Sequence, residues 1–323
     1  MTRQVAEIVE SLDRPSRTRA GHHWVFDHVP AFEGLAPAGH EVDYVGSVTA
    51  PDLQGGAPAP AGEAWYSPSP PPVDDEYPEW TDLLEAVLDA GDRFTFVELG
   101  AGFGRWTARA ALAARRRGIP DVRLVMVEGE PLHARWARRH MALNGVTPDQ
   151  YRLIEAAVGA TAGTAPFIVE PPGAAAPEAA TAGRWYGQCL ASSAHLGNPR
   201  RAEGRYDQRP RLSVEGGYTA IEVPVVTLDT VLDGLDRVDL VDMDIQGEEG
   251  PLIAANADLL TRAVRRLHVE THSTAVEAEV REALAGAGWV CLRDHSVGTT
   301  SSTPFGEVVR EGGVQGWLNP RLC

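Results

Sequence analysis

The chain has 323 residues, 43% of them hydrophobic, and a net charge of −16. This length allows one large domain, or one domain with an appendage. The acidic excess argues against a nucleic-acid groove, because such a groove needs a basic surface to neutralise phosphates.

The chemistry of the chain is limited further by the residue types it lacks. All 29 basic side chains are arginines, which excludes a lysine base or Schiff base. Cys189, Cys291 and Cys323 show neither metal-type spacing nor a disulfide framework. The first residues hold no signal-peptide apolar region, and no apolar run is long enough to span a membrane. We expect a soluble, cytoplasmic protein that acts on a small molecule without nucleic acid or membrane; a homo-oligomer stays open.

The chain is expected to divide into two parts. Residues 1–78 are predicted to form an N-terminal extension or cap, and residues 79–323 the main domain. The segment 51–72 is rich in Pro, Gly and Ala, which predicts an extended connector. Tyr77 follows it and is a candidate substrate contact. Apolar residues at helical spacing then predict an amphipathic helix over 80–88.

A glycine-rich turn follows this helix. Residues 94–99 form a short apolar run typical of a buried strand, and the Ala- and Arg-rich stretch 107–117 favours a helix. Glycines in such a turn let the backbone approach a ligand, and the N–H groups at the start of the helix point toward it. The expected ligand-binding residues of the turn are Gly100, Ala101, Gly102 and Gly104.

Glu98, two residues before the first glycine, indicates which ligand binds there. A dinucleotide places its pyrophosphate over a G-x-G-x-x-G turn. Here the spacing is G-x-G-x-G, and the Glu98 carboxylate would repel a pyrophosphate. S-adenosylmethionine (SAM) suits an acid better, because it carries an ammonium and a sulfonium but no phosphate. We therefore predict that SAM binds at this turn, with Glu98 among its contacts.

The second strand, predicted over 122–127, ends at two acids. A carboxylate at this place accepts hydrogen bonds from both hydroxyls of a ribose. Glu128 at the strand tip is the preferred contact. Glu130 is the second choice, since it also fits an acid that complements the dipole of the helix opening at Pro131.

The third strand is predicted over 151–158, with Ala157 near its end, where a small residue lets an adenine ring lie flat. A proline- and alanine-rich insertion follows. A polar loop then contains an aromatic cluster suited to stacking on a sugar or an adenine. Its candidate substrate contacts are Trp185, Tyr186 and Gln188.

Two later strands end in ionisable residues. Alternation places Asp242 and Asp244 on one face of a strand, where two buried acids are costly unless they are used. Asp244 lies at the carboxyl end, where ligands bind in open α/β sheets. The strand predicted over 266–272 ends in Glu270 and His272.

These strand ends supply the candidate catalytic groups. A hydroxyl acceptor must lose its proton, so a base beside the methyl group helps the reaction. His272 and Asp244 are the candidates, and Glu270 is expected to orient the histidine; His195 is a weaker alternative. Asp244, Glu270 and Thr271 also offer the oxygen ligands that Mg²⁺ prefers, but a metal-free site is favoured and metal ligands are left unassigned.

The repeated β-α order, closed by two last strands over 288–294 and 307–318, predicts a doubly wound α/β sheet. Together the motifs resemble the FkbM family of SAM-dependent methyltransferases. The matching stretches are Val97-Glu-Leu-Gly-Ala-Gly-Phe-Gly104, Val127-Glu-Gly-Glu-Pro131, Val226-Thr-Leu-Asp-Thr230, Asp242-Met-Asp-Ile-Gln-Gly-Glu-Glu249 and Val269-Glu-Thr-His272.

The resemblance implies the seven-stranded, Rossmann-like class I methyltransferase fold, SAM as methyl donor, and O-methylation of sugars, polyketides or other secondary metabolites. Two rival functions stay open. One is a SAM- or metabolite-binding protein without turnover. The other is a nicotinamide oxidoreductase, which Glu98 and the glycine spacing disfavour.

Overall fold

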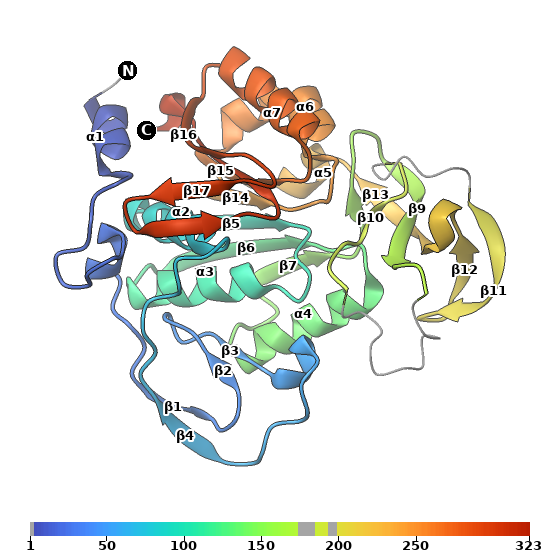
Figure 1. The fold of residues 1–323 in the computed structure, drawn as a ribbon, viewed down its shortest axis with the longest axis horizontal. Coiled ribbons are helices and arrows are strands. Elements are labelled where there is room, and N and C mark those ends of the chain that lie inside the picture. Colours follow the sequence, from blue (N-terminus) through green and yellow to red (C-terminus); the bar gives the residue numbers. More distant parts are fainter. Residues whose placement is uncertain (1–2, 174–184, 193–198) are drawn as a thin grey trace.

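The structure is a computed structural model, which describes residues 3–173, 185–192 and 199–323 (Figure 1). Its centre is a seven-stranded sheet in the order β16-β19-β15-β14-β5-β6-β7. All neighbouring strands in it are parallel except where β19 pairs with β15 and β16. The expected doubly wound, seven-stranded fold is confirmed. Its strands are β5 (Arg93–Leu99), β6 (Asp121–Val127), β7 (Tyr151–Ile154), β14 (Leu240–Met243), β15 (Arg266–Thr271), β16 (Val290–His295) and β19 (Gly313–Leu318).

Helices cover both faces of this sheet, because side chains alternate along each buried strand. Phe94 and Phe96 of β5 pack toward one set of helices, and Val97 and Leu99 pack toward the other. The first set is α2 (Tyr77–Asp89), α3 (Arg105–Arg116) and α4 (Pro131–Leu143). The second set is α5 (Leu228–Leu232), α6 (Glu249–Ala263) and α7 (Thr274–Gly286).

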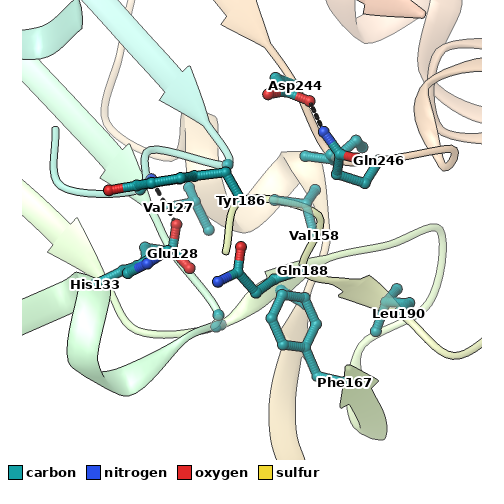
Figure 2. A pocket seen from close by; sticks show the side chains of 16 residues that line it. Val127, Glu128, His133, Val158, Phe167, Tyr186, Gln188, Leu190, Asp244 and Gln246 are labelled. Atoms are coloured by element: carbon teal, nitrogen blue, oxygen red, sulfur yellow. Dashed lines mark hydrogen bonds between the residues drawn. The ribbon is translucent and has the colours of Figure 1, made fainter. Parts of the chain in front are cut away.

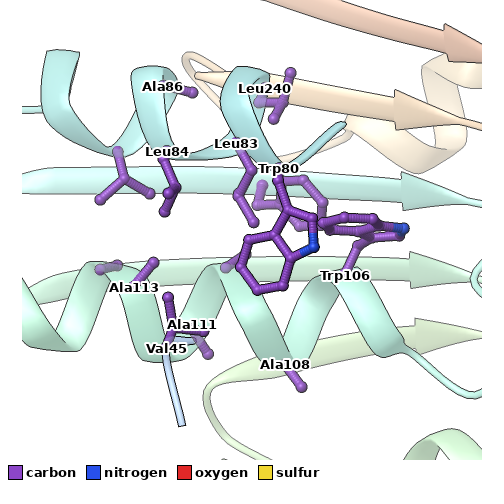
Figure 3. Packing of buried hydrophobic residues seen from close by; sticks show 14 of the residues in the cluster. Val45, Trp80, Leu83, Leu84, Ala86, Trp106, Ala108, Ala111, Ala113 and Leu240 are labelled. Carbon is purple, nitrogen blue, oxygen red and sulfur yellow. The ribbon is translucent and has the colours of Figure 1, made fainter. Parts of the chain in front are cut away.

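Figure 3 shows how closely the first set packs. Trp80 of α2 meets Trp106 of α3 edge to face, with the ring centroids 5.4 Å apart. Short side chains such as Ala108 and Ala111 are buried on α3, so this helix lies close to its neighbours at interior packing density. The start of α3, where the glycine turn ends, is therefore held firmly in place.

A second sheet lies beside the central one, at the right of Figure 1. Its order is β10-β9-β13-β12-β11, with β8 beside β13. The prediction of one strand over 151–158 was wrong: the chain turns after Ile154, and Ala157 pairs with Val225 of the second sheet. The strands of this sheet are β8 (Ala157–Val158), β9 (Gly163–Glu170), β10 (Cys189–Leu190), β11 (Arg200–Tyr206), β12 (Arg209–Ser213) and β13 (Thr219–Val226), with the short helix η3 (Glu215–Gly217) before β13.

The N-terminal part packs on the first set of helices. Phe26 and Tyr44 are buried in the same cluster as Trp80. Part of the expected connector has regular structure, because β4 pairs with β1 and a short helix begins at Pro51. The elements here are α1 (Arg3–Ser11), η1 (Trp24–Asp27), β1 (Gly34–Pro37), β2 (Glu41–Val42), β3 (Val48–Thr49), η2 (Pro51–Gln54) and β4 (Glu63–Tyr66).

The C-terminal part contains a hairpin that the sequence did not predict. The strand expected over 307–318 is interrupted near Gly312, so β17 (Thr300–Thr303) and β18 (Gly306–Val309) form a separate pair before β19. The chain ends in η4 (Pro320–Leu322). Within the described residues, none of the helices combines the length and the apolar character that crossing a membrane requires.

Candidate functional site

The glycine turn connects β5 to α3 and forms one edge of a cavity. Gly100 and Gly102 line this cavity, whereas Ala101 and Gly104 do not. Ala101 is buried in the core, and a Cβ on Gly104 would lie 2.7 Å from Sδ of Met126. All three glycines have positive φ, which favours glycine sterically. Two of the four expected turn contacts therefore reach the cavity, and the other two shape the turn.

Glu98 does not line the cavity. Its carboxylate lies beneath the turn and accepts the N–H of Thr107 at 2.9 Å, the N–H of Trp106 at 3.3 Å and the Thr107 hydroxyl. Burial and the nearby Asp242 raise the pKa of Glu98 to about 8. Its side chain points to the face of β5 that α3 covers, and contact between Glu98 and the ligand stays a prediction.

Glu128 lies in the cavity wall, as preferred from the sequence. Its two carboxylate oxygens accept the N–H of Gly102 at 2.6 Å and the N–H of Glu130 at 2.7 Å. Burial, partly offset by these N–H groups, raises the pKa of Glu128 to about 8. Glu130 is fully buried and accepts the N–H of His133 at 2.6 Å, so it caps α4.

The cavity lies over the carboxyl ends of the parallel strands (Figure 2). It holds about 570 Å³ of empty space, open mouth included. Figure 2 shows Asp244 and Gln246 on one side and Glu128 and His133 on the other. The lining residues are Gly100, Gly102, Val127, Glu128, Gly129, His133, Ala156, Ala157, Val158, Phe167, Tyr186, Gln188, Leu190, Asp244, Ile245 and Gln246.

Two of the four expected substrate contacts lie in this wall. Tyr186 stacks on His133 with ring centroids 4.9 Å apart, and Gln188 lies two residues farther along. Trp185 does not line the cavity and packs near Tyr218. Tyr77 is buried in the core, where its hydroxyl accepts the N–H of His23 at 2.8 Å. Substrate contacts by Trp185 and Tyr77 stay predictions.

Asp244 and His272 meet at the edge of the cavity. His272 Nε2 lies 3.3 Å from Oδ1 of Asp244, and its Nδ1 lies 3.2 Å from Oε1 of Glu249. Glu249 also accepts the N–H groups of Ile245 and Gly247, which fixes the loop after β14. Glu249 thus holds the position expected of Glu270.

These contacts change the acid–base state of the histidine. Burial by itself lowers the pKa of His272, but Glu249 and Asp244 outweigh it and raise the pKa to about 9. His272 is therefore mainly an imidazolium at neutral pH. Burial, partly offset by His272, raises the pKa of Asp244 to about 6, so Asp244 is mainly a carboxylate.

One of the three oxygen ligands considered for a cation, the hydroxyl of Thr271, is turned away from Asp244. A Cβ on Gly313 would collide with Oγ1 of the fully buried Thr271, so this hydroxyl points to β19. Asp244, Glu249 and His272 instead place one ligand atom each within 4.8 Å of one another. The metal-free site favoured from the sequence stays a prediction. His195 lies outside the described residues.

Sequence reasoning missed several residues of the site. Gln246 and Glu249 lie inside the matching stretch 242–249, between the end of β14 and the first residue of α6, and this position was a usable signal. His133 and Phe167 also line the cavity but had no such signal. Phe167 in particular comes from β9 of the second sheet.

Comparison with known proteins identifies the family. The model of the methyltransferase FkbM domain matches residues 98–291. A protein of Jannaschia sp. (strain CCS1) named "Putative methyltransferase" is 28% identical over 218 residues, 67% of this chain and 69% of that protein.

Two solved structures are also similar. Methyltransferase FkbM from Methylobacillus flagellatus KT has a TM-score of 0.40 at 11% identity, over 70% of this chain but only 44% of that one. A SAM-dependent methyltransferase from Agrobacterium tumefaciens has a TM-score of 0.40 at 10% identity, over 76% of this chain and 62% of that one. The FkbM domain model covers more than half of the present chain, which is therefore a methyltransferase of the FkbM family.

Proposed function

We propose that the protein transfers a methyl group from SAM to a hydroxyl group of a small molecule, such as a sugar, a glycoside or another secondary metabolite. The single observation that supports this most is the linked set Asp244, His272 and Glu249 beside the glycine turn. It joins a carboxylate that faces the cavity to a fixed imidazolium behind it.

The cavity fits the parts of SAM, the donor that the family implies. Glu128 presents its carboxylate at the tip of β6, where it can accept from the ribose hydroxyls while it keeps the N–H of Gly102. Ala157 and Phe167 provide an apolar wall for a flat ring. Asp244 is an acid open to the cavity, and its charge suits an ammonium or sulfonium group. When bound, SAM supplies an electrophilic methyl group.

Asp244 is the group best placed to accept the proton of the hydroxyl. It lines the cavity, whereas His272 does not. An alcohol oxygen becomes strongly acidic as its bond to the methyl carbon forms, so a carboxylate is a sufficient base. His272, held by Glu249, orients Asp244 through the 3.3 Å contact. Of the two candidates from the sequence, His272 and Asp244, we therefore prefer Asp244 as the base.

The test is methyl transfer from labelled SAM to methyl glycosides, phenols and aliphatic alcohols, each beside its amino analogue. SAM binding is measured first by calorimetry. We expect an ether product and one S-adenosylhomocysteine per ether. Label on the amines alone would refute O-methylation, and SAM binding without turnover on any compound would favour a non-catalytic binding protein.

Variants separate the two ionisable groups. Asp244→Asn should lower the turnover rate by about 10²–10⁴-fold, and His272→Asn by about tenfold, because it only positions the base. The exposed Asp229→Asn, on α5, is the matched control and should be unchanged. A larger loss in His272→Asn than in Asp244→Asn would return the role of base to the histidine.

A further inference from the structure

Helix α2 turns an acidic face toward the central sheet. Glu79, Asp82 and Glu85 are all buried there. Asp82 pairs with Arg293, and Glu85 pairs with Arg266 at 2.8 Å. In the part of the chain that the structure describes, no arginine forms an ion pair with Glu79. Glu79 therefore lacks the arginine partner that Asp82 and Glu85 have. A buried carboxylate without such a partner is costly in free energy.

The groups opposite Glu79 are another acid and a histidine. Asp242 of β14 and His268 of β15 are directly paired in the register of these parallel strands. Glu79, Asp242 and His268 each place one ligand atom within 4.8 Å of the others. Their exposed fractions are 7%, 4% and 1%, so water cannot readily solvate them.

The state of His268 shows what this cluster lacks. Its Nδ1 lies 2.8 Å from Oδ2 of Asp82, a carboxylate that also pairs with Arg293. Nδ1 therefore carries the proton, and Nε2 presents a lone pair. Within the described residues, neither Nε2 of His268 nor Oδ1 of Asp242 has a hydrogen-bond partner. Two buried acceptor atoms beside Glu79 therefore lack a donor.

We propose that Glu79, Asp242 and His268 bind one divalent transition-metal ion, Zn²⁺ in the first instance. One imidazole and carboxylate oxygens form a ligand set that zinc accepts. The two carboxylates balance the charge of the ion. Asp82, through its contact with Nδ1, holds the histidine as the outer carboxylate of a metal-bound histidine does.

This site differs from the cavity in place and in role. None of its three ligands lines the cavity, and Asp242 lies two residues before Asp244 on β14. The ion would join α2 to β14 and β15 beneath the active site, so its role is structural. The inference does not depend on the methyl acceptor.

A shared proton is the rival occupant. Burial, followed by the charges of Asp242 and Glu270, raises the pKa of Glu79 well above its usual range. Without a cation, one proton between the carboxyl groups of Glu79 and Asp242 would relieve their repulsion. Metal content separates the two cases.

The experiment uses the full chain, purified without a polyhistidine tag from medium containing zinc and dialysed against a chelator that removes surface ions. Elemental analysis should find about one zinc ion per chain. Unfolding in chelator followed by refolding with Zn²⁺ should raise the melting temperature above that of protein refolded without metal. Absence of zinc together with no rise in melting temperature would refute the site.

Variants locate the ion. His268→Gln and Asp242→Asn should reduce the zinc content to below about one tenth of the wild-type value. Glu85→Gln, from the same helix face, and His272→Asn, from the outer cluster, should keep it. Zinc that survives His268→Gln but is lost in His272→Asn would assign the ion to Asp244 and Glu249 and overturn the proposal. If the inner variants do not fold, Co²⁺ binding is compared in wild type and His272→Asn: binding by both supports the inner site, and loss in His272→Asn overturns it.

Discussion

Glu98 and Glu128 are two carboxylates at the ends of neighbouring parallel strands, and they serve different purposes. Both accept backbone N–H groups from the glycine turn or the helix after it. Burial is the main cause that raises the pKa of each to about 8. Yet Glu98 lies under the turn and holds α3, whereas Glu128 lies beside the turn and faces the cavity.

The difference comes from the direction of the two side chains relative to the turn. Glu98 is on the same face of β5 as Phe94 and Phe96, the face that α3 covers. Glu128 follows the last residue of β6 and is free to reach across to Gly102. Whether a carboxylate near a glycine-rich turn can reach a ligand therefore depends on whether it lies within the strand or after it. Its charge and its pKa do not distinguish the two cases.

Among the substitutions considered, one at Gly100 in the turn between the two acids should have the largest effect on stability and on SAM binding. In Gly100→Ala, the new methyl group would collide with the carbonyl oxygen of Asp244, at a φ of +83°. Steric overlap and left-handed strain together should cost roughly 2–5 kcal/mol of unfolding free energy, and SAM binding should be lost.

Urea unfolding and calorimetry measure the two effects of this change. Gly118→Ala is the matched control, because its φ is +73° but nothing lies within 4 Å of the added Cβ. It should cost only about 1 kcal/mol of stability and leave SAM affinity intact. Similar losses in both variants would mean that backbone strain, and not the contact with Asp244, limits this position.

Glu98 should matter for stability more than for binding. In Glu98→Ala, the N–H of Thr107, its hydroxyl and the N–H of Trp106 lose their acceptor, which should cost roughly 2–4 kcal/mol of unfolding free energy. Glu98→Gln keeps an acceptor and, given a pKa of about 8, resembles the protonated acid; it should be nearly silent at pH 7. A loss of SAM affinity in Glu98→Gln with unchanged stability would indicate that Glu98 contacts the ligand directly.

The contrast also shows what the sequence could and could not reveal. The order of apolar runs, glycines and helices predicted the central sheet, and the position of Glu128 after a strand predicted its place in the cavity wall. The burial of Glu98 could not be predicted, because it depends on which face of β5 is covered by α3. The packing of Trp185 near Tyr218 likewise could not be predicted, because the two residues are distant in the sequence.

Contacts between distant segments were beyond sequence reasoning for another reason. Phe167 reaches the cavity through the second sheet, where β9 pairs with β13 some fifty residues later. Glu249 replaces Glu270 beside His272 because the loop after β14 curls back and its N–H groups bind Glu249. Neither arrangement follows from spacing along one strand.

Substitution of Glu128, unlike that of Glu98, should affect SAM binding more than stability. At pH 9, above the pKa of about 8 of Glu128, Glu128→Ala should weaken SAM binding by roughly 1–3 kcal/mol, the range for losing charge-assisted hydrogen bonds, as measured by calorimetry. Glu130→Ala, the matched control, removes the cap of α4 and should cost about 1 kcal/mol of stability with a smaller change in affinity. Equal losses of affinity would show that the helix end, and not the carboxylate of Glu128, determines binding.

The pH dependence of binding provides the finest distinction between the two acids. With a pKa of about 8, Glu128 is mainly protonated at pH 7, and hydroxyls that donate to a carboxylate favour its ionised form. SAM affinity should therefore rise as pH increases through 8, by about tenfold between pH 7 and pH 9.

SAM, Glu130 and Asp244 also carry ionisable groups near this carboxyl, so the quantity to follow is the ratio of wild-type affinity to that of Glu128→Gln. Titrations that both proteins share largely cancel in this ratio, and its rise isolates Glu128. The same ratio taken with Glu98→Gln should stay flat, because Glu98 titrates beneath the turn without touching the ligand. A flat ratio for Glu128→Gln between pH 7 and pH 9 would mean that this carboxyl stays protonated in the complex, and its contact with the ribose would then be that of a neutral acid.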